Sequence, residues 1–302
     1  MTTRKRSVNA LALAAVAIAA LALTTPASAA PLWTPADITT ELWLDASDAS
    51  TITETAGAMS QWNDKSGNAR NATQATAANQ PTTGALTQNG LNVISFDGTN
   101  DYFDLGTGLD WMAGTSHVAF GVLLNTNYSN LYGAATNGGA NANRLHVGFR
   151  DATAYRMNFW ANDYNPAITA NYNVGQYNFM RWDWSQGGNK SIYANAKLEG
   201  TGGSPAGTIA AMSAGGRINN VVVGGNQGIL DMELAELVFV EGTPTQDTID
   251  KIEGYLAWKW GLQANLPSGH AYENAAPIPE PATMSLLALG GLAVLRRRRR
   301  RA

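Results

Sequence analysis

The sequence predicts an all-β fold, a β-sandwich with one amphipathic helix near its C-terminal end. From residue 41 onward, short apolar or alternating runs are separated by Gly, Asn and Asp, and no helical period is seen before residue 244. Nine Trp and ten Tyr can fill a core, and 31 Gly supply turns. The stretch 30–276 fits one elaborate sandwich rather than two domains.

The first 29 residues have the pattern of a secretory signal peptide. Arg4, Lys5 and Arg6 precede an apolar run over 10–23, and small residues at 27–29 predict cleavage after Ala29. The alternative, a permanent N-terminal anchor, is disfavoured because the run is short and ends in a cleavable pattern. The body is therefore expected to be exported, and with no Cys it folds without disulfides.

The strands of the body are predicted from runs of apolar or alternating residues. Turns at 97–101 and 186–189, rich in Asp, Asn and Gly, separate several of these runs. The clearest strands are expected over 93–96, 117–124, 145–149, 155–160, 177–184, 191–198, 219–223 and 232–240.

One helix follows the last strand. Thr243 is its predicted N-cap, with Pro244 in the first turn and Gln246 as the reciprocal partner. An apolar stripe should pack on the sandwich, and Gly261 should end the helix. The stripe consists of Ile249, Ile252, Leu256 and Trp260.

The C-terminal segment 277–302 has three parts. Pro279, Glu280 and Pro281 precede an apolar stretch over 282–295, and six Arg follow at 296–301. Fourteen residues at about 1.5 Å each give roughly 21 Å, short for a hydrocarbon core of about 30 Å. The stretch is therefore expected to be a temporary inner-membrane anchor, its Arg run held inside. The apolar segment in front argues against a nucleic-acid-binding tail.

This three-part arrangement resembles the PEP-CTERM sorting signal of Gram-negative bacteria. The resemblance implies processing by exosortase, an inner-membrane protease, near Pro279–Pro281, which would be substrate rather than catalyst. It also implies delivery to the cell surface or to an exopolysaccharide matrix.

Several segments of the body resemble concanavalin A-like, laminin-G-type (LamG) jelly-roll domains. The resemblance specifies the sandwich as a jelly roll, a fold that does not fix function. The matching segments are 42–48, 62–68, 96–102, 254–262 and 265–272.

Charge excludes one class of partner. Nine of the 20 basic residues lie in the two ends, so the body carries eleven basic against 22 acidic residues, a net charge of −11. Such a body repels nucleic acid.

No catalytic set stands out in the sequence. Jelly-roll glucanases carry two Glu with an Asp between them. The nearest stretch here, 231–236, has Asp231 before Glu233 but no acid between Glu233 and Glu236. On a regular strand Glu233 and Glu236 point to opposite faces, and without a bulge they cannot flank one glycosidic bond. The sequence therefore predicts a protein that is not an enzyme. Because Asp231 and Glu233 share a face of the strand, a glycosidase remains an alternative interpretation.

Two binding sites are predicted. Oxygen ligands gather at Asp97, Asn100, Asp101 and Asp104, a chemistry suited to Ca²⁺. The alternative is a turn whose Asp and Asn satisfy their own backbone.

The second predicted site is for carbohydrate. Arg156, Asn158 and Trp160 share one face of a strand, with Tyr164 just beyond. Aromatic rings stack on the apolar faces of sugars, while amides and charged groups bond their hydroxyls.

The expected function is an exported surface or matrix protein that binds carbohydrate or matrix polymer, with exosortase and polysaccharide as its partners. The alternatives are a purely structural or adhesive matrix protein and a jelly-roll glycoside hydrolase.

Overall fold

The computed structural model describes residues 32–135, 145–159, 163–203, 214–222 and 226–278. The predicted signal peptide, the sorting segment from Pro279 onward and Trp160 lie outside these residues. Leu32–Pro277 form one compact unit. Within the described residues, no helix has both the length and the apolar character needed to cross a membrane.

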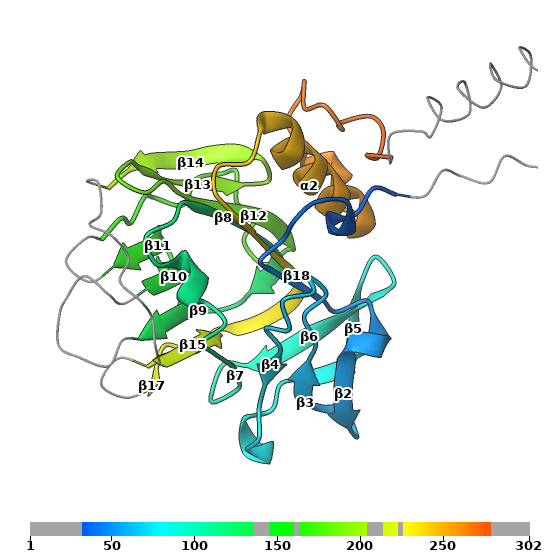
Figure 1. The fold of residues 1–302 in the computed structure, drawn as a ribbon. Coiled ribbons are helices and arrows are strands. Elements are labelled where there is room, and N and C mark those ends of the chain that lie inside the picture. Colours follow the sequence, from blue (N-terminus) through cyan, green and yellow to red (C-terminus); the bar gives the residue numbers. More distant parts are fainter. Residues whose placement is uncertain (1–31, 136–144, 160–162, 204–213, 223–225, 279–302) are drawn as a thin grey trace, which may run out of the picture. The chain divides into compact units, whose positions relative to one another are not determined.

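The unit is built almost entirely of antiparallel strands, with a single α-helix among the described residues (Figure 1). The helix α2 covers Gln246–Lys259. The strands are β1 (Leu42–Asp45), β2 (Ile52–Thr55), β3 (Ala58–Trp62), β4 (Ala72–Thr73), β5 (Thr82–Gln88), β6 (Leu91–Asp97), β7 (Phe103–Gly106), β8 (His117–Asn125), β9 (Asn130–Ala135), β10 (Leu145–Asp151), β11 (Ala154–Phe159), β12 (Asn178–Trp184), β13 (Lys190–Ala194), β14 (Lys197–Gly202), β15 (Ala214–Ile218), β16 (Val221–Val222), β17 (Asn226–Gln227) and β18 (Asp231–Glu241).

The long strand β18 organises the sheet. It pairs with β8 along one edge, and its other edge is shared by β6 and then by β1. The register with β8 shifts between Leu234 and Glu236, so Ala235 is an extra residue, a β-bulge. The bulge lies where the partner on the other edge changes from β6 to β1.

The sheet folds over into two layers that enclose the main core. Tyr132 on β9 meets Trp182 on β12 and Phe239 on β18, with ring centroids 6.3 Å and 4.9 Å away. Trp182 and Trp184 are buried together with Met180, on one face of β12. Tyr155 and Met157 of β11 are buried in the same core.

A second core lies between α2 and the outer face of β8, β12 and β18 (Figure 1). Ile249, Ile252 and Leu256 of the predicted stripe are buried in it, as is Trp260 just past the helix. The segment before β1 adds Trp33, whose ring lies 6.3 Å from that of Tyr255. Gly261 follows the helix with φ of +70°, a left-handed conformation that favours Gly.

The prediction of an all-β antiparallel fold with one helix is confirmed, and three details differ. The run 191–198 forms two strands, β13 and β14, joined by Asn195 and Ala196 with positive φ. The run 219–223 contains only the short β16 within the described residues. The N-cap is Thr245 rather than Thr243, because the Thr245 hydroxyl accepts the backbone N–H of Thr248 at 3.2 Å.

Candidate functional site

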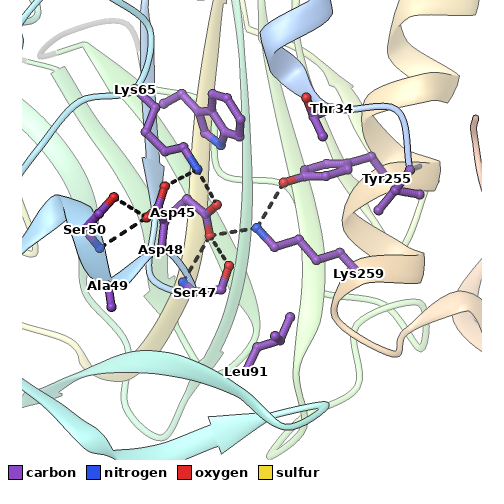
Figure 2. Close-up of a pocket in the computed structure, with 12 residues that line it drawn as sticks. Thr34, Asp45, Ser47, Asp48, Ala49, Ser50, Lys65, Leu91, Tyr255 and Lys259 are labelled. Carbon is purple, nitrogen blue, oxygen red and sulfur yellow. Dashed lines mark hydrogen bonds and ion pairs between the residues drawn. The ribbon is translucent and has the colours of Figure 1, made fainter. Parts of the chain in front are cut away.

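An open pocket of about 660 Å³ lies beside β1 and the last turn of α2. Figure 2 shows that its polar side chains converge from segments far apart in the chain. Both acidic and basic groups line it, together with aromatic and aliphatic surface. The lining residues are Leu32, Thr34, Trp43, Asp45, Ser47, Asp48, Ala49, Ser50, Lys65, Leu91, Tyr255 and Lys259.

Glu236 lies beneath this pocket and is fully buried. Its Oε1 accepts from the Trp43 indole N–H at 2.7 Å and from the Tyr255 hydroxyl at 2.9 Å. Its Oε2 accepts from Lys259 Nζ and from the Trp260 indole N–H, both at 2.8 Å. Burial raises the pKa of Glu236, against the opposing charge of Lys259.

Asp45 is the second buried carboxylate and lies between two ammonium groups. Lys259 Nζ is 2.7 Å from its Oδ1, and Lys65 Nζ is 2.9 Å from its Oδ2. The N–H and hydroxyl of Ser47 also donate to Oδ1. Burial alone would raise the pKa of Asp45, but the charge and hydrogen bond of Lys259, with those of Ser47 and Lys65, outweigh burial and lower it.

Asp48 and Lys65 form the more exposed rim of the pocket. Their charged atoms are 2.8 Å apart, and their side chains are 31% and 22% exposed. The hydrogen bond from Lys65, helped by Ser50, lowers the pKa of Asp48 to about 2. Lys65 Nζ also lies 4.4 Å from the centre of the Trp43 ring. The rim therefore keeps both charges at neutral pH and can donate and accept hydrogen bonds in fixed directions.

Sequence reasoning singles out these segments as fold signatures but misses them as a site. Asp45 ends the apolar run 42–45, and Lys259 sits between two Trp in 256–260. A charged residue inside an apolar run is the signal that points to a buried pair. Which charges meet depends on β1 and α2 both packing on β18, and local spacing does not encode that.

The predicted carbohydrate row is used partly in the protein's own packing. Asn158 is buried and accepts the backbone N–H of Tyr164 at 3.0 Å. Tyr164 lies against β14, where a Cβ added to Gly200 would stand 2.5 Å from the tyrosine hydroxyl. Arg156 Nη1 donates to Asn130 at 3.0 Å. The structure thus brings Asn158 and Tyr164 together, and the sugar-binding role of the row stays a prediction.

The predicted calcium residues occupy the turn between β6 and β7. Oδ1 of Asp97 accepts the backbone N–H groups of Thr99, Asn100 and Asp101, and Asp101 in turn accepts that of Asp97. Burial and the nearby Asp97 raise the pKa of Asp101 to about 6.

The other two calcium candidates bond elsewhere. The Asn100 amide donates to Ala78, and Asp104 pairs with Arg217 at 2.7 Å. The turn satisfies much of its own backbone, and calcium binding there stays a prediction.

A further acid and histidine cluster, absent from the sequence prediction, joins α2 to the segment that follows it, beside Arg181 of β12. Ligand atoms of Asp250, Glu253 and His270 lie within 4.8 Å of one another. The backbone N–H of Tyr272 donates to His270 Nδ1 at 3.1 Å, so a neutral His270 carries its proton on Nε2, facing the carboxylates. Arg181 already pairs with Glu253 at 2.7 Å. A protonated Nε2 and a neighbouring guanidinium both disfavour a metal ion here.

The β18 bulge changes the expected geometry of the two glutamates. Leu234 and Leu237 face the main core, whereas Ala235 and Glu236 both face the second core. Glu233 bonds the Tyr177 hydroxyl, and Tyr177 belongs to that second core, so Glu233 and Glu236 share a face. The prediction of opposite faces is wrong because of the extra residue. Glu236 remains enclosed, with both oxygens occupied.

The C-terminal residues 277–301 match the family described as the PEP-CTERM protein-sorting motif. The chain is therefore an exported protein that exosortase processes and that reaches the cell surface. Curated protein sequences give no significant match.

Among the solved structures similar to the body are parts of a sialidase, an arabinofuranosidase and an arabinanase. Trypanosoma rangeli sialidase in complex with sialic acid aligns with TM-score 0.51 and 13% identity over 72% of this chain and 33% of that one. A GH54 α-L-arabinofuranosidase aligns with TM-score 0.51 and 15% identity over 73% of this chain and 59% of that one. Domain 4 of the Geobacillus stearothermophilus arabinanase AbnA, in complex with arabinotriose, aligns with TM-score 0.49 and 12% identity over 70% of this chain and 96% of that one.

These neighbours correct the prediction that the protein is not an enzyme. The sialidase and the arabinofuranosidase cleave glycosides, and the chain matches a third and about three fifths of their lengths. At such low identity the likeness establishes the fold alone. Because this fold occurs within glycosidases, a missing glucanase pattern does not exclude catalysis. The chain is thus an exosortase-sorted surface protein whose β-sandwich body has the fold of domains found in carbohydrate-acting enzymes.

Proposed function

We propose that the body is a jelly-roll domain that binds carbohydrate at the cell surface, with the pocket bordered by Asp48 and Lys65 as its binding site. The observation that carries this proposal is the pocket itself. Its volume of about 660 Å³ lies within the range typical of ligand sites, ~300–1,000 Å³. A carboxylate and an ammonium are fixed at its rim.

The lining suits a polyhydroxylated ligand for two reasons. Sugar hydroxyls both donate and accept, so they can bond the Asp48 carboxylate and the Lys65 ammonium together. Leu32, Leu91 and the ring of Tyr255 offer apolar surface to the faces of a sugar ring. The net charge of −11 on the body also favours a neutral ligand over a polyanion.

The final location that fits this ligand is the outer surface or the surrounding polysaccharide matrix of a Gram-negative cell.

The proposal is tested by titrating the purified full chain with a panel of polysaccharides in a calorimeter, with and without Ca²⁺. Saturable binding by at least one neutral polymer is expected. Lys65→Gln and Asp48→Asn should each weaken it about 10- to 100-fold, because a hydrogen bond to a charged group contributes about 1.5–3 kcal/mol. Asn retains the helix-capping oxygen that Asp48 supplies to Ser50.

Asp247→Asn is the matched control, since it removes an equally negative but exposed carboxylate on α2. If no polymer binds, or if the two rim variants bind as well as the control, the pocket is not the site. The titrations with and without Ca²⁺ also test the calcium site predicted from sequence. A Trp160→Ala variant in the same titrations tests the predicted carbohydrate row.

A second candidate function, glycoside cleavage, is suggested by the fold shared with glycosidases, with Glu233 as its candidate carboxylate. Glu233 is half-buried and bonded to Tyr177, which lines a separate pocket of about 390 Å³. If the body cleaves glycosides, polymers in the panel release sugar and Glu233→Gln abolishes that release. Binding without any release leaves carbohydrate binding as the activity.

A further inference from the structure

We propose that Lys259 and Asp45 join covalently, forming an amide between the lysine Nζ and the aspartate side-chain carbonyl with loss of one water molecule. The bond would tie β1 to the end of α2. Asp45 and Lys259 line the proposed binding pocket, but the modification needs no ligand in it.

The reacting groups are already in position. Lys259 Nζ lies 2.7 Å from Asp45 Oδ1, so the carboxyl carbon bonded to that oxygen is within reach of the amine. The Asp45 side chain is 5% exposed and that of Lys259 is 12% exposed. Well-oriented groups in one molecule react with effective molarities of about 10⁵–10⁸ M, which offsets the unfavourable equilibrium of amide formation in water.

Glu236 supplies the proton transfer that the condensation needs. Its Oε2 is 2.8 Å from the same Nζ, and the residue is fully buried. Because burial raises the pKa of Glu236, its carboxylate is a stronger proton acceptor than an exposed one. Two aromatic neighbours, Trp43 and Trp260, hold Glu236 through their indole N–H groups and help to exclude water.

The steps balance without any further reactant. Glu236 takes a proton from the Lys259 ammonium and passes it to Asp45 Oδ1, and the free amine then attacks the Asp45 carboxyl carbon. Glu236 next takes a second proton from the attached nitrogen and returns it to Oδ1. Oδ1 leaves as water with these two protons, while the third ammonium proton stays on the amide nitrogen and Glu236 is a carboxylate again.

Asp45 has a second lysine partner, and its role differs. Lys65 Nζ lies 2.9 Å from Oδ2, the oxygen that remains in the amide, and it can stabilise negative charge there during the attack. The carboxylate that Lys65 contacts besides Asp45 is Asp48, which belongs to the exposed rim. Lys259, which contacts the buried Glu236, is therefore the nucleophile.

The bond would give this exported chain, which has no Cys, a covalent cross-link that disulfides cannot supply. Disulfides are the usual covalent ties of extracellular proteins, and none can form here. An amide from residue 45 to residue 259 would close most of the body into one loop and reduce the conformational entropy of the unfolded chain.

Mass spectrometry of the purified full chain tests the proposal. After denaturation and digestion with trypsin, a branched peptide is expected that joins the segment containing Asp45 to the segment containing Lys259. Its mass should be that of the two peptides less one water, and trypsin should not cleave after Lys259. The intact chain should migrate faster on a denaturing gel than the open form.

Three variants assign the roles. Lys259→Arg keeps the positive charge but removes the nucleophile, and Glu236→Gln keeps the side-chain size but removes the proton acceptor, so both should be unlinked. Lys65→Arg is the matched control and should remain linked. Circular dichroism shows whether each variant is folded.

Because the wild type is measured directly, the test does not depend on any variant folding. Folded wild type with two separate unmodified peptides overturns the proposal, and the cluster is then an ion-pair network only. A branched peptide through Lys65 would equally overturn the assignment of Lys259.

Discussion

At the scale of single residues, the body depends on charged side chains buried where the sequence pattern is apolar. Before any amide forms, Lys259 is the positive partner of both Asp45 and Glu236, and neither carboxylate is more than slightly exposed. Removing one partner from a buried ion pair leaves an uncompensated charge, which costs about 3–5 kcal/mol.

We therefore expect Lys259→Met to lower the free energy of unfolding by at least about 3–5 kcal/mol, measured by urea denaturation at neutral pH, because it removes the ion pair and also prevents the amide. Lys251→Met on the same helix is the control. Lys251 pairs with the exposed Asp247 four residues earlier, a contact worth only about 0.3–0.5 kcal/mol. Equal losses in the two variants would show that the buried cluster adds no more than a surface pair.

The residue scale is also where sequence reasoning reaches its limit for the site. Asp45 and Lys259 are visible as charges in apolar runs, but Glu236 looks like an alternating residue of a half-exposed strand. Its burial follows from one extra residue at Ala235, which turns Glu236 toward α2. A two-residue period cannot indicate such a bulge.

At the scale of elements, apolar periodicity predicts that a helix or strand is present better than it predicts where that element begins and ends. The helix and its buried stripe are where the apolar spacing places them, but its first turn begins at Gln246 with Thr245 as N-cap. Two threonines flank Pro244, and either fits a capping pattern. The hydroxyl of Thr245 is the one that reaches Thr248.

This cap gives a matched pair of variants. Thr245→Ala should lower the free energy of unfolding by about 1 kcal/mol, since the Thr248 N–H loses its acceptor. Thr243→Ala, an exposed position two residues earlier, should change it by less than about 0.5 kcal/mol. Thermal melts followed by circular dichroism measure both, and a larger effect at Thr243 would move the cap back to the position predicted from sequence.

At the scale of the whole molecule, strand pairing is the part that the sequence does not specify. β18 pairs with β1, β6 and β8, three strands drawn from the first half of the chain. Alternation shows which face of each strand is apolar, but many strand orders satisfy the same alternation. The resemblance to jelly-roll domains, rather than periodicity, supplies the expected architecture.

The net charge of −11 makes stability depend on pH, and buried carboxylates set the direction. Burial raises the pKa of Asp101 to about 6 from 3.8. A carboxyl with a raised folded-state pKa contributes stability below about pH 4, and this contribution is lost as the pH rises through about 6. The pKa of Asp48, lowered to about 2, acts in the opposite sense. Its contribution to stability is present above about pH 4 and is lost as the pH falls toward about 2.

The melting temperature should therefore fall between about pH 4 and pH 7, and Asp101→Asn should reduce that fall. Asn resembles the neutral carboxyl and keeps an oxygen that can accept the Asp97 N–H. A shift of about two pKa units corresponds to at most about 3 kcal/mol, so the variant should be more stable than wild type at pH 8 and about equal at pH 4. Asp247→Asn, at an exposed carboxylate, should keep the wild-type slope. A parallel pH profile for Asp101→Asn and wild type would mean that Asp101 is ionised throughout this range, because only a proton gained on folding can produce the slope.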